Sequence, residues 1–128
     1  LDFIQHNKLE KRVKILSGLD LFEMSCIYQK AEMMIYPSVF EGFGIPILEA
    51  LNCQIPVITT KGGCFSEAGG KNSLYVDPLS IDSISDAIIK IEHDQNLKDK
   101  MIEEGYTHAQ KFNDETISIN LMKIYSSL

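Results

Sequence analysis

Two glutamates eight positions apart frame a glycine-bearing loop, where carboxylates could bind the hydroxyl groups of a ligand. Glu41 opens the loop, Gly42 and Gly44 follow, and Glu49 lies one to two helical turns further on. Glycine has no Cβ, so a phosphate can approach the backbone of this loop closely. The first N–H groups of a helix have no intrahelical partner and lie at the positive end of its dipole. The stretch therefore predicts an anion site flanked by two carboxylates.

A strand and a helix are expected to position this loop. The run Met33–Tyr36 is apolar and short, as in a strand buried on both of its faces. Pro37 has no N–H to donate, so the strand is predicted to end there. Pro46 suits the first turn of the next helix, where a missing N–H costs little.

The helix after the loop has one apolar side and one mixed side. At about 100° per residue, the side chains that share the apolar side are Ile47, Leu48, Ala50 and Leu51. Glu49 lies opposite, so the helix is predicted to pack on the sheet and to turn Glu49 towards whatever lies beyond. From the pattern alone, the alternative is a solvated Glu49 and a Glu41 that is an ordinary loop residue.

Strands and helices alternate as far as Val76, which indicates a parallel α/β sheet. The predicted strands are Val13–Leu16, Met33–Tyr36, Ile55–Thr59 and Leu74–Val76. The predicted helices are the end of one within Leu1–Lys11, one capped by Asp20 with Glu23, one to about Cys53 and a short one over Cys64–Ala68. Three more follow, from Ser80 or Asp82, from about Asn96 to Lys111, and from Asp114 to Ser126.

Three loops are expected at the carboxyl ends of the strands, where parallel sheets bind their ligands. They are Ser17–Asp20, Ser38–Gly44 and Thr60–Glu67. The last contains a second glycine turn, Gly62–Gly63. This turn is equally consistent with a simple tight turn and with a ligand contact.

The bulk properties exclude several classes of protein. The 128 residues are 45% hydrophobic, which suits one globular domain or part of one. A net charge of -6 argues against general nucleic-acid binding, which needs a basic face. The three cysteines form no C-x-x-C pair and are interpreted as buried free thiols in a reducing compartment. No histidine is assigned a catalytic role.

The stretch Glu41–Glu49 reads EGFGIPILE and resembles the E-x7-E signature of retaining glycosyltransferases of the GT-B fold, in particular family 4. That family commonly reads P-S-x-x-E-G-F-G-x-P-x-x-E-A. The matching residues are Pro37, Ser38, Glu41, Gly42, Phe43, Gly44, Pro46, Glu49 and Ala50. The resemblance continues in Pro56–Ile58 and Tyr75–Pro78, and it is most secure from about Val13 to Lys111.

The resemblance implies a nucleotide-sugar donor site and transfer with retention of the anomeric configuration. Glu41 would be the catalytic candidate and would hold hydroxyls of the transferred sugar, while Glu49 would accept hydrogen bonds from the ribose. Backbone N–H groups would meet the sugar and the diphosphate. The implied donor-binding residues are Glu41, Gly42, Phe43, Gly44, Ile45, Glu49, Thr60, Gly62 and Gly63. No D-x-D signature is present, so no metal and no cofactor beyond the donor are implied.

The resemblance also implies that residues 1–128 are a partial donor-binding domain, Rossmann-like with an all-helical C-terminal segment. Family members usually carry two earlier βα units and a G-R-x-x-x-x-K-G type segment whose cations neutralise the phosphates, and this chain has neither. The isolated chain is therefore expected to lack transferase activity. The acceptor, a glycan or lipid-linked saccharide, would bind a separate domain, in the cytoplasm or at the inner face of the membrane.

In the strand order 3-2-1-4-5-6 of this fold, Val13–Leu16 and Met33–Tyr36 would each lack a neighbour. Either these two segments pair with each other, or the bare edge is covered by self-association.

Two other classes of protein compete with a transferase. One is a non-catalytic module that binds nucleotide sugars or sugar phosphates, and the other is a generic doubly wound domain of the response-regulator type.

Overall fold

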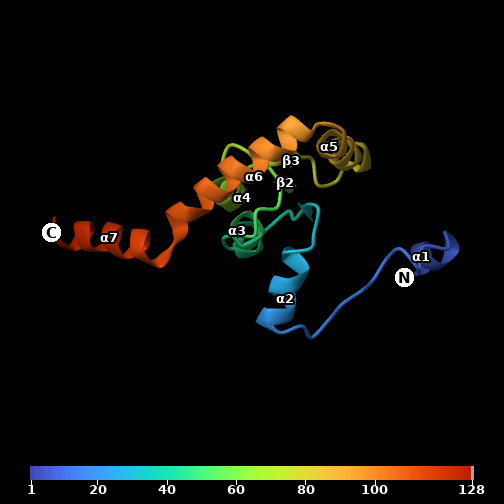
Figure 1. The fold of residues 1–128 in the computed structure, drawn as a ribbon, viewed down its shortest axis with the longest axis horizontal. Coiled ribbons are helices and arrows are strands. Elements are labelled where there is room, and N and C mark those ends of the chain that lie inside the picture. Colours follow the sequence, from blue (N-terminus) through green and yellow to red (C-terminus); the bar gives the residue numbers. More distant parts are fainter. Residues whose placement is uncertain (128) are drawn as a thin grey trace.

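The computed structural model describes residues 1–127, and a three-stranded parallel sheet forms the centre of the fold (Figure 1). The strands are β1 (Met34–Tyr36), β2 (Val57–Thr60) and β3 (Leu74–Val76), in the order β1-β2-β3. Strand β2 begins two residues later than predicted, because Pro56 has no N–H for the ladder. The Pro56 carbonyl instead accepts a hydrogen bond from the Met34 N–H at 2.9 Å.

Helices cover both faces of this sheet, as the apolar strands require. On one face α3 (Ile45–Asn52) and α4 (Gly63–Gly69) bury Ile47, Leu51 and Phe65 against Val57. On the other face α5 (Ile81–His93) packs on Ile58, which points the opposite way from Val57. The predicted α/β class with flanking helices is confirmed.

Helix α6 (Gln95–Ala109) connects the two halves of the core. Met101 belongs to the cluster under α5, and Ala109 belongs to the cluster under α3. Gly105 lets α6 approach α3 closely, because a Cβ at this position would lie 2.8 Å from Cδ2 of Leu51. The α-helix ends at Ala109, two residues before the predicted end at Lys111, and a 3₁₀ turn over Gln110–Phe112 follows it.

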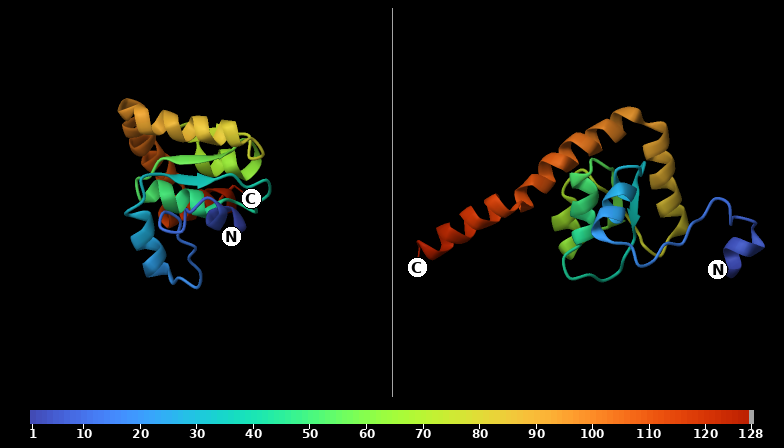
Figure 2. Two further views of the ribbon diagram at one scale, coloured as in Figure 1. Left: turned by 90° about the vertical axis from the view of Figure 1, so that its right-hand side faces the viewer. Right: turned by 60° about the horizontal axis from the view of Figure 1, so that its bottom comes forward.

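The two ends of the chain extend from this body (Figure 2). Helix α7 (Asp114–Tyr125) begins at the Asn113 cap and projects away, and none of its residues is buried. At the other end α1 (Asp2–His6) is a single short helix that also has no buried residue. No helix within residues 1–127 is both long enough and apolar enough to cross a membrane.

The predicted strand over Val13–Leu16 is wrong. The segment pairs with no strand among residues 1–127, and the Ile15 side chain is 67% exposed. A strand forms only where a neighbour offers hydrogen-bond partners, and β1 pairs with β2 alone. Closure of the edge by Val13–Leu16 is therefore wrong as well, whereas self-association stays a prediction.

Helix α2 (Leu21–Tyr28) follows this segment and confirms the capping box predicted at its start. The Asp20 carboxylate accepts from the Glu23 N–H at 2.8 Å, and the Glu23 carboxylate accepts from the Asp20 N–H at 2.9 Å. A reciprocal cap of this kind fixes where a helix begins. It places Tyr28 near the end of α2, beside α3.

Candidate functional site

Two of the three predicted loops meet at the carboxyl ends of β1 and β2. The Thr60 hydroxyl donates to the Ser38 carbonyl at 2.8 Å, which joins the loop after β1 to the loop after β2. A cavity of about 460 Å³ lies between them, lined by Val39, Phe40, Glu41, Gly42, Thr60, Lys61, Gly62, Gly63, Cys64 and Phe65. The convergence of these two loops is confirmed, and the loop Ser17–Asp20 lines no part of this cavity.

The Glu41 side chain is held from within its own loop, and its backbone carbonyl is held from α4. The Ser38 hydroxyl lies 3.0 Å from Glu41 Oε1 and donates to it. The Glu41 carboxylate, more than burial, raises the pKa of Tyr36 to about 12. The Cys64 thiol donates to the Glu41 backbone carbonyl at 3.3 Å. These contacts hold a half-buried carboxylate at the mouth of the cavity.

Gly44 is the junction between the loop and helix α3. It caps the helix with φ at +93°, a conformation that side chains with a Cβ rarely adopt. A Cβ there would also lie 3.3 Å from Ile47 Cδ1 and 3.4 Å from Ala68 Cβ. Within residues 1–127, the backbone N–H groups of Phe43, Gly44 and Ile45 donate no hydrogen bond. Open donors at a helix start are suited to an anion.

Glu49 lies on the side of α3 that faces α2, as the helical pattern predicts. The Tyr28 hydroxyl donates to Glu49 Oε2 at 3.1 Å. Burial, and then this hydrogen bond, raise the pKa of Tyr28 to about 12. A second cavity of about 260 Å³ lies here, lined by Leu21, Met24, Ser25, Tyr28, Glu49, Asn52 and Cys53.

The predicted site residues therefore fall into two pockets and a connecting segment. Five of them line the cavity between the loops: Glu41, Gly42, Thr60, Gly62 and Gly63. Of the predicted residues, only Glu49 lines the pocket against α2. The segment Phe43–Ile45 connects the two, and the Phe43 ring packs edge-on against Phe112 with centroids 5.8 Å apart.

Sequence reasoning missed Lys61 as a site residue. Its side chain lines the cavity that contains Glu41. A lysine directly before the Gly62–Gly63 turn was the available signal, because a cation beside a glycine turn suits an anion.

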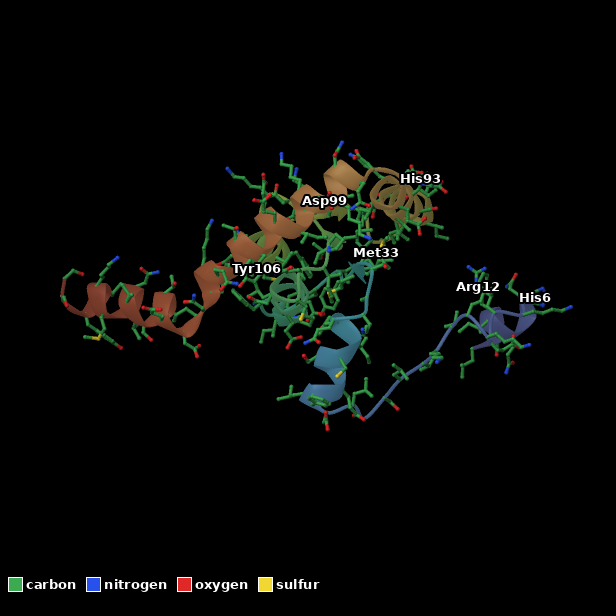
Figure 3. All side chains as sticks on the ribbon, viewed as in Figure 1. His6, Arg12, Met33, His93, Asp99 and Tyr106 are labelled. Carbon is green, nitrogen blue, oxygen red and sulfur yellow. The ribbon has the colours of Figure 1, made fainter. Side chains whose placement is uncertain are left out.

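A further cavity of about 760 Å³ lies between α4 and α6. Its lining includes Lys61, Lys71, Glu103, His108 and Lys111, and it contains none of the predicted site residues. His6 and Arg12 lie on the N-terminal segment, and His93 lies on α5 (Figure 3). Within residues 1–127, no group of three His, Cys, Asp or Glu side chains could hold a metal ion. The two pockets around Glu41 and Glu49 are lined by predicted site residues and are therefore the candidate site.

A parallel α/β unit with glycine loops at its carboxyl edge is the architecture of nucleotide-binding domains. Residues 2–108 match the family described as glycosyl transferases group 1, and the chain belongs to this family. The O-antigen chain mannosyltransferase B of Escherichia coli is 31% identical over 125 residues. This match covers 98% of the chain and 33% of that enzyme, so the chain spans about a third of the relative's length.

Two solved structures of the GT-B class share the fold. Anabaena HepE, solved in complex with UDP and glucose, superposes with a TM-score of 0.85 at 25% identity, covering 99% of this chain and 35% of HepE. The C-terminal domain of a glycosyl transferase group 1 family protein from Francisella tularensis superposes with a TM-score of 0.76 at 26% identity. It covers 87% of this chain, which in turn covers 58% of that domain.

Proposed function

We propose that this chain supplies the nucleotide-sugar donor site of a retaining glycosyltransferase that transfers a hexosyl-type sugar. The observation that carries the proposal is the hydrogen bond from Thr60 to the Ser38 carbonyl, which joins two glycine-bearing loops around one cavity. The cavity contains both a carboxylate, Glu41, and a cation, Lys61. Hydroxyl groups and a diphosphate are the ligand groups that this combination suits.

The donor fits the two pockets in a defined direction. The sugar and diphosphate would occupy the cavity between the loops, with sugar hydroxyls on Glu41 and phosphates near Lys61. The open N–H groups of the segment Phe43–Ile45 would stabilise the negative charge that grows on the leaving diphosphate. The ribose would lie towards Glu49, whose carboxylate can accept from two hydroxyls.

The acceptor would bind outside residues 1–128, and we therefore expect the chain to bind donor without transferring sugar. We propose that this acceptor is a glycan or lipid-linked saccharide and that transfer takes place in the cytoplasm or at the inner face of the membrane; an O-antigen chain mannosyltransferase is among the relatives. A bare strand edge supports the further proposal that the chain self-associates. Strand β1 pairs on one side only, and its Ile35 is 40% exposed. Light scattering of the purified chain measures this directly.

Isothermal titration with UDP and with a panel of nucleotide sugars tests the donor site. Glu49→Gln should weaken UDP binding by about 1–3 kcal/mol, roughly five- to 150-fold, the range for a lost hydrogen bond to a charged group. Glu41→Gln should weaken nucleotide-sugar binding and leave UDP binding unchanged. The control is Glu92→Gln, an exposed glutamate on α5.

Two results would contradict the proposal. One is that neither UDP nor any nucleotide sugar binds the folded chain. The other is that Glu41→Gln and Glu49→Gln both bind like Glu92→Gln.

The retaining mechanism has a separate test, since proton NMR of any product formed with an acceptor reads the anomeric configuration. An inverted product would rule out retention but not the donor site.

A further inference from the structure

The hydrogen bond between Tyr28 and Glu49 links two elements that are distant in the sequence. Tyr28 is at the end of α2 and Glu49 is in the middle of α3, 21 residues later. The bond is 3.1 Å long and half-buried. Within residues 1–127, it is the only hydrogen bond that a side chain makes to the Glu49 carboxylate, and it uses Oε2.

The surroundings of the pair favour one orientation of the carboxylate. Tyr28 packs against the buried cluster that includes Ile47 and Leu51, so its ring is fixed by the core. The pocket beside it has mostly apolar walls, with Leu21 and Met24 among its lining residues. A carboxylate held at one oxygen by a fixed donor presents its other oxygen in a defined direction.

The tyrosine is a dependable donor. Its raised pKa keeps the hydroxyl protonated well above neutral pH, so Tyr28 remains a hydrogen-bond donor there. Phenylalanine has the same ring without the hydroxyl, and it removes the bond while preserving the packing. Tyr28→Phe therefore tests the hydrogen bond separately from the packing of the ring.

We propose that Tyr28 is a positioning residue that orients Glu49 to receive the ribose hydroxyls of the donor nucleotide. This inference rests on the proposed function, in which Glu49 is the ribose acceptor. It adds that α2, which contributes nothing to the cavity between the loops, sets the nucleoside end of the site. Oε2 stays on Tyr28, and Oε1 is left to accept from the ribose.

The test compares two probes, UDP and 2′,3′-dideoxy-UDP, by isothermal titration of the 128-residue chain. Tyr28→Phe should weaken UDP binding about two- to twelvefold, because it removes one hydrogen bond that holds the Glu49 carboxylate and leaves the carboxylate itself in place. Binding of the dideoxy probe should not change, because it has no ribose hydroxyls for Glu49. The matched control is Tyr106→Phe, a partly exposed tyrosine on α6 (Figure 3).

A double-mutant cycle separates the inference from the proposed function. If Tyr28 acts through Glu49, then Tyr28→Phe should have no effect on UDP binding in a Glu49→Gln background. If Glu49→Gln weakens UDP binding but Tyr28→Phe does not, the role of Tyr28 is wrong and the donor site stands. If Glu49→Gln has no effect, the ribose role itself is wrong, and the inference fails with it.

One outcome identifies a merely structural role for the tyrosine. Should Tyr28→Phe weaken UDP and dideoxy-UDP equally, the substitution has disturbed the fold of the site rather than the orientation of one carboxylate. That result would overturn the inference. Circular dichroism and a thermal melt of each variant accompany the titrations, so that a loss of folded protein is recognised.

Discussion

The pockets around Glu41 and Glu49 belong to one loop and helix, yet they are built in different ways. Glu41 is held by Ser38, three residues earlier, in a cavity that contains Lys61 and two glycine turns. Glu49 is held by Tyr28 from a separate helix, in a smaller pocket that contains no lysine or arginine among the described residues. The difference teaches that the Glu41 carboxylate is held from within its own loop, whereas the Glu49 carboxylate depends on how α2 packs.

Gly44 joins the two pockets, and its substitution should have the largest effect. Gly44→Ala places a Cβ at positive φ and against Ile47 and Ala68. We expect a loss of about 1–3 kcal/mol in the free energy of unfolding, measured in urea. Both pockets should lose their ligand affinity together, because the loop and the helix start shift as a unit.

Gly42→Ala is the matched substitution within the same loop. A Cβ at this position meets nothing within 4 Å, and its φ is not in the left-handed region. Its stability should change by less than about 0.5 kcal/mol. A loss of UDP affinity without a loss of stability would then show that ligand approaches the backbone there, and equal destabilisation by both variants would contradict this account of Gly44.

Substitution of Lys61 tests whether the two pockets bind different parts of the nucleotide. Lys61→Gln should weaken UDP binding by about 1–2 kcal/mol, within the range for hydrogen bonds to charged groups, and should leave uridine binding unchanged. Titrations in rising salt should reduce the difference between wild type and variant, since exposed charges are screened. Lys90→Gln, exposed on α5, is the control. If uridine binding falls as much as UDP binding, Lys61 does not serve the phosphates.

Ser38 tests the local support of Glu41. Ser38→Ala removes the hydroxyl that donates to Glu41 Oε1, at 3.0 Å. We expect nucleotide-sugar affinity to fall by about 0.5–1.5 kcal/mol while UDP affinity stays constant. Ser118→Ala on α7, measured in the same titration, serves as the control. Loss of UDP affinity as well would mean that the two pockets are less independent than the contacts indicate.

The smallest effect is a pH dependence confined to alkaline solution. The pKa of Tyr28 and of Tyr36 rises from 10.0 to about 12 on folding. The folded chain therefore holds these protons more tightly than the unfolded chain, and stability should fall as pH rises from 10 to 12. Urea unfolding of Tyr28→Phe and Tyr36→Phe should show a shallower fall over this window. An unchanged slope in both variants would mean that the glutamates do not interact with these phenols.

Features that repeat along the chain could be predicted from the sequence. The apolar run at β2 and the apolar side of α3 specify buried faces by their spacing alone, and the structure confirms both. The carboxyl-end loops follow from the parallel order of the strands. The spacing of Glu41 and Glu49 also predicts a site on one loop and helix, and their ligand-binding role stays a prediction.

Features that depend on a distant partner could not be predicted. Tyr28 occupies an apolar position of α2 in the sequence pattern, and nothing local shows that its hydroxyl faces Glu49. Val13–Leu16 has the composition of a strand but no neighbour to pair with. In both cases the deciding contact lies in the tertiary structure, which composition and periodicity do not specify.

The close approach of α6 to α3 at Gly105 has a consequence for how sequences of this fold can diverge. Leu51 fills the space that a side chain at position 105 would need, so the two positions share a single volume. Relatives with alanine at the position of Gly105 should carry a smaller residue at the position of Leu51. Residues 51 and 105 are therefore expected to covary, although they come from different helices and neither touches the donor.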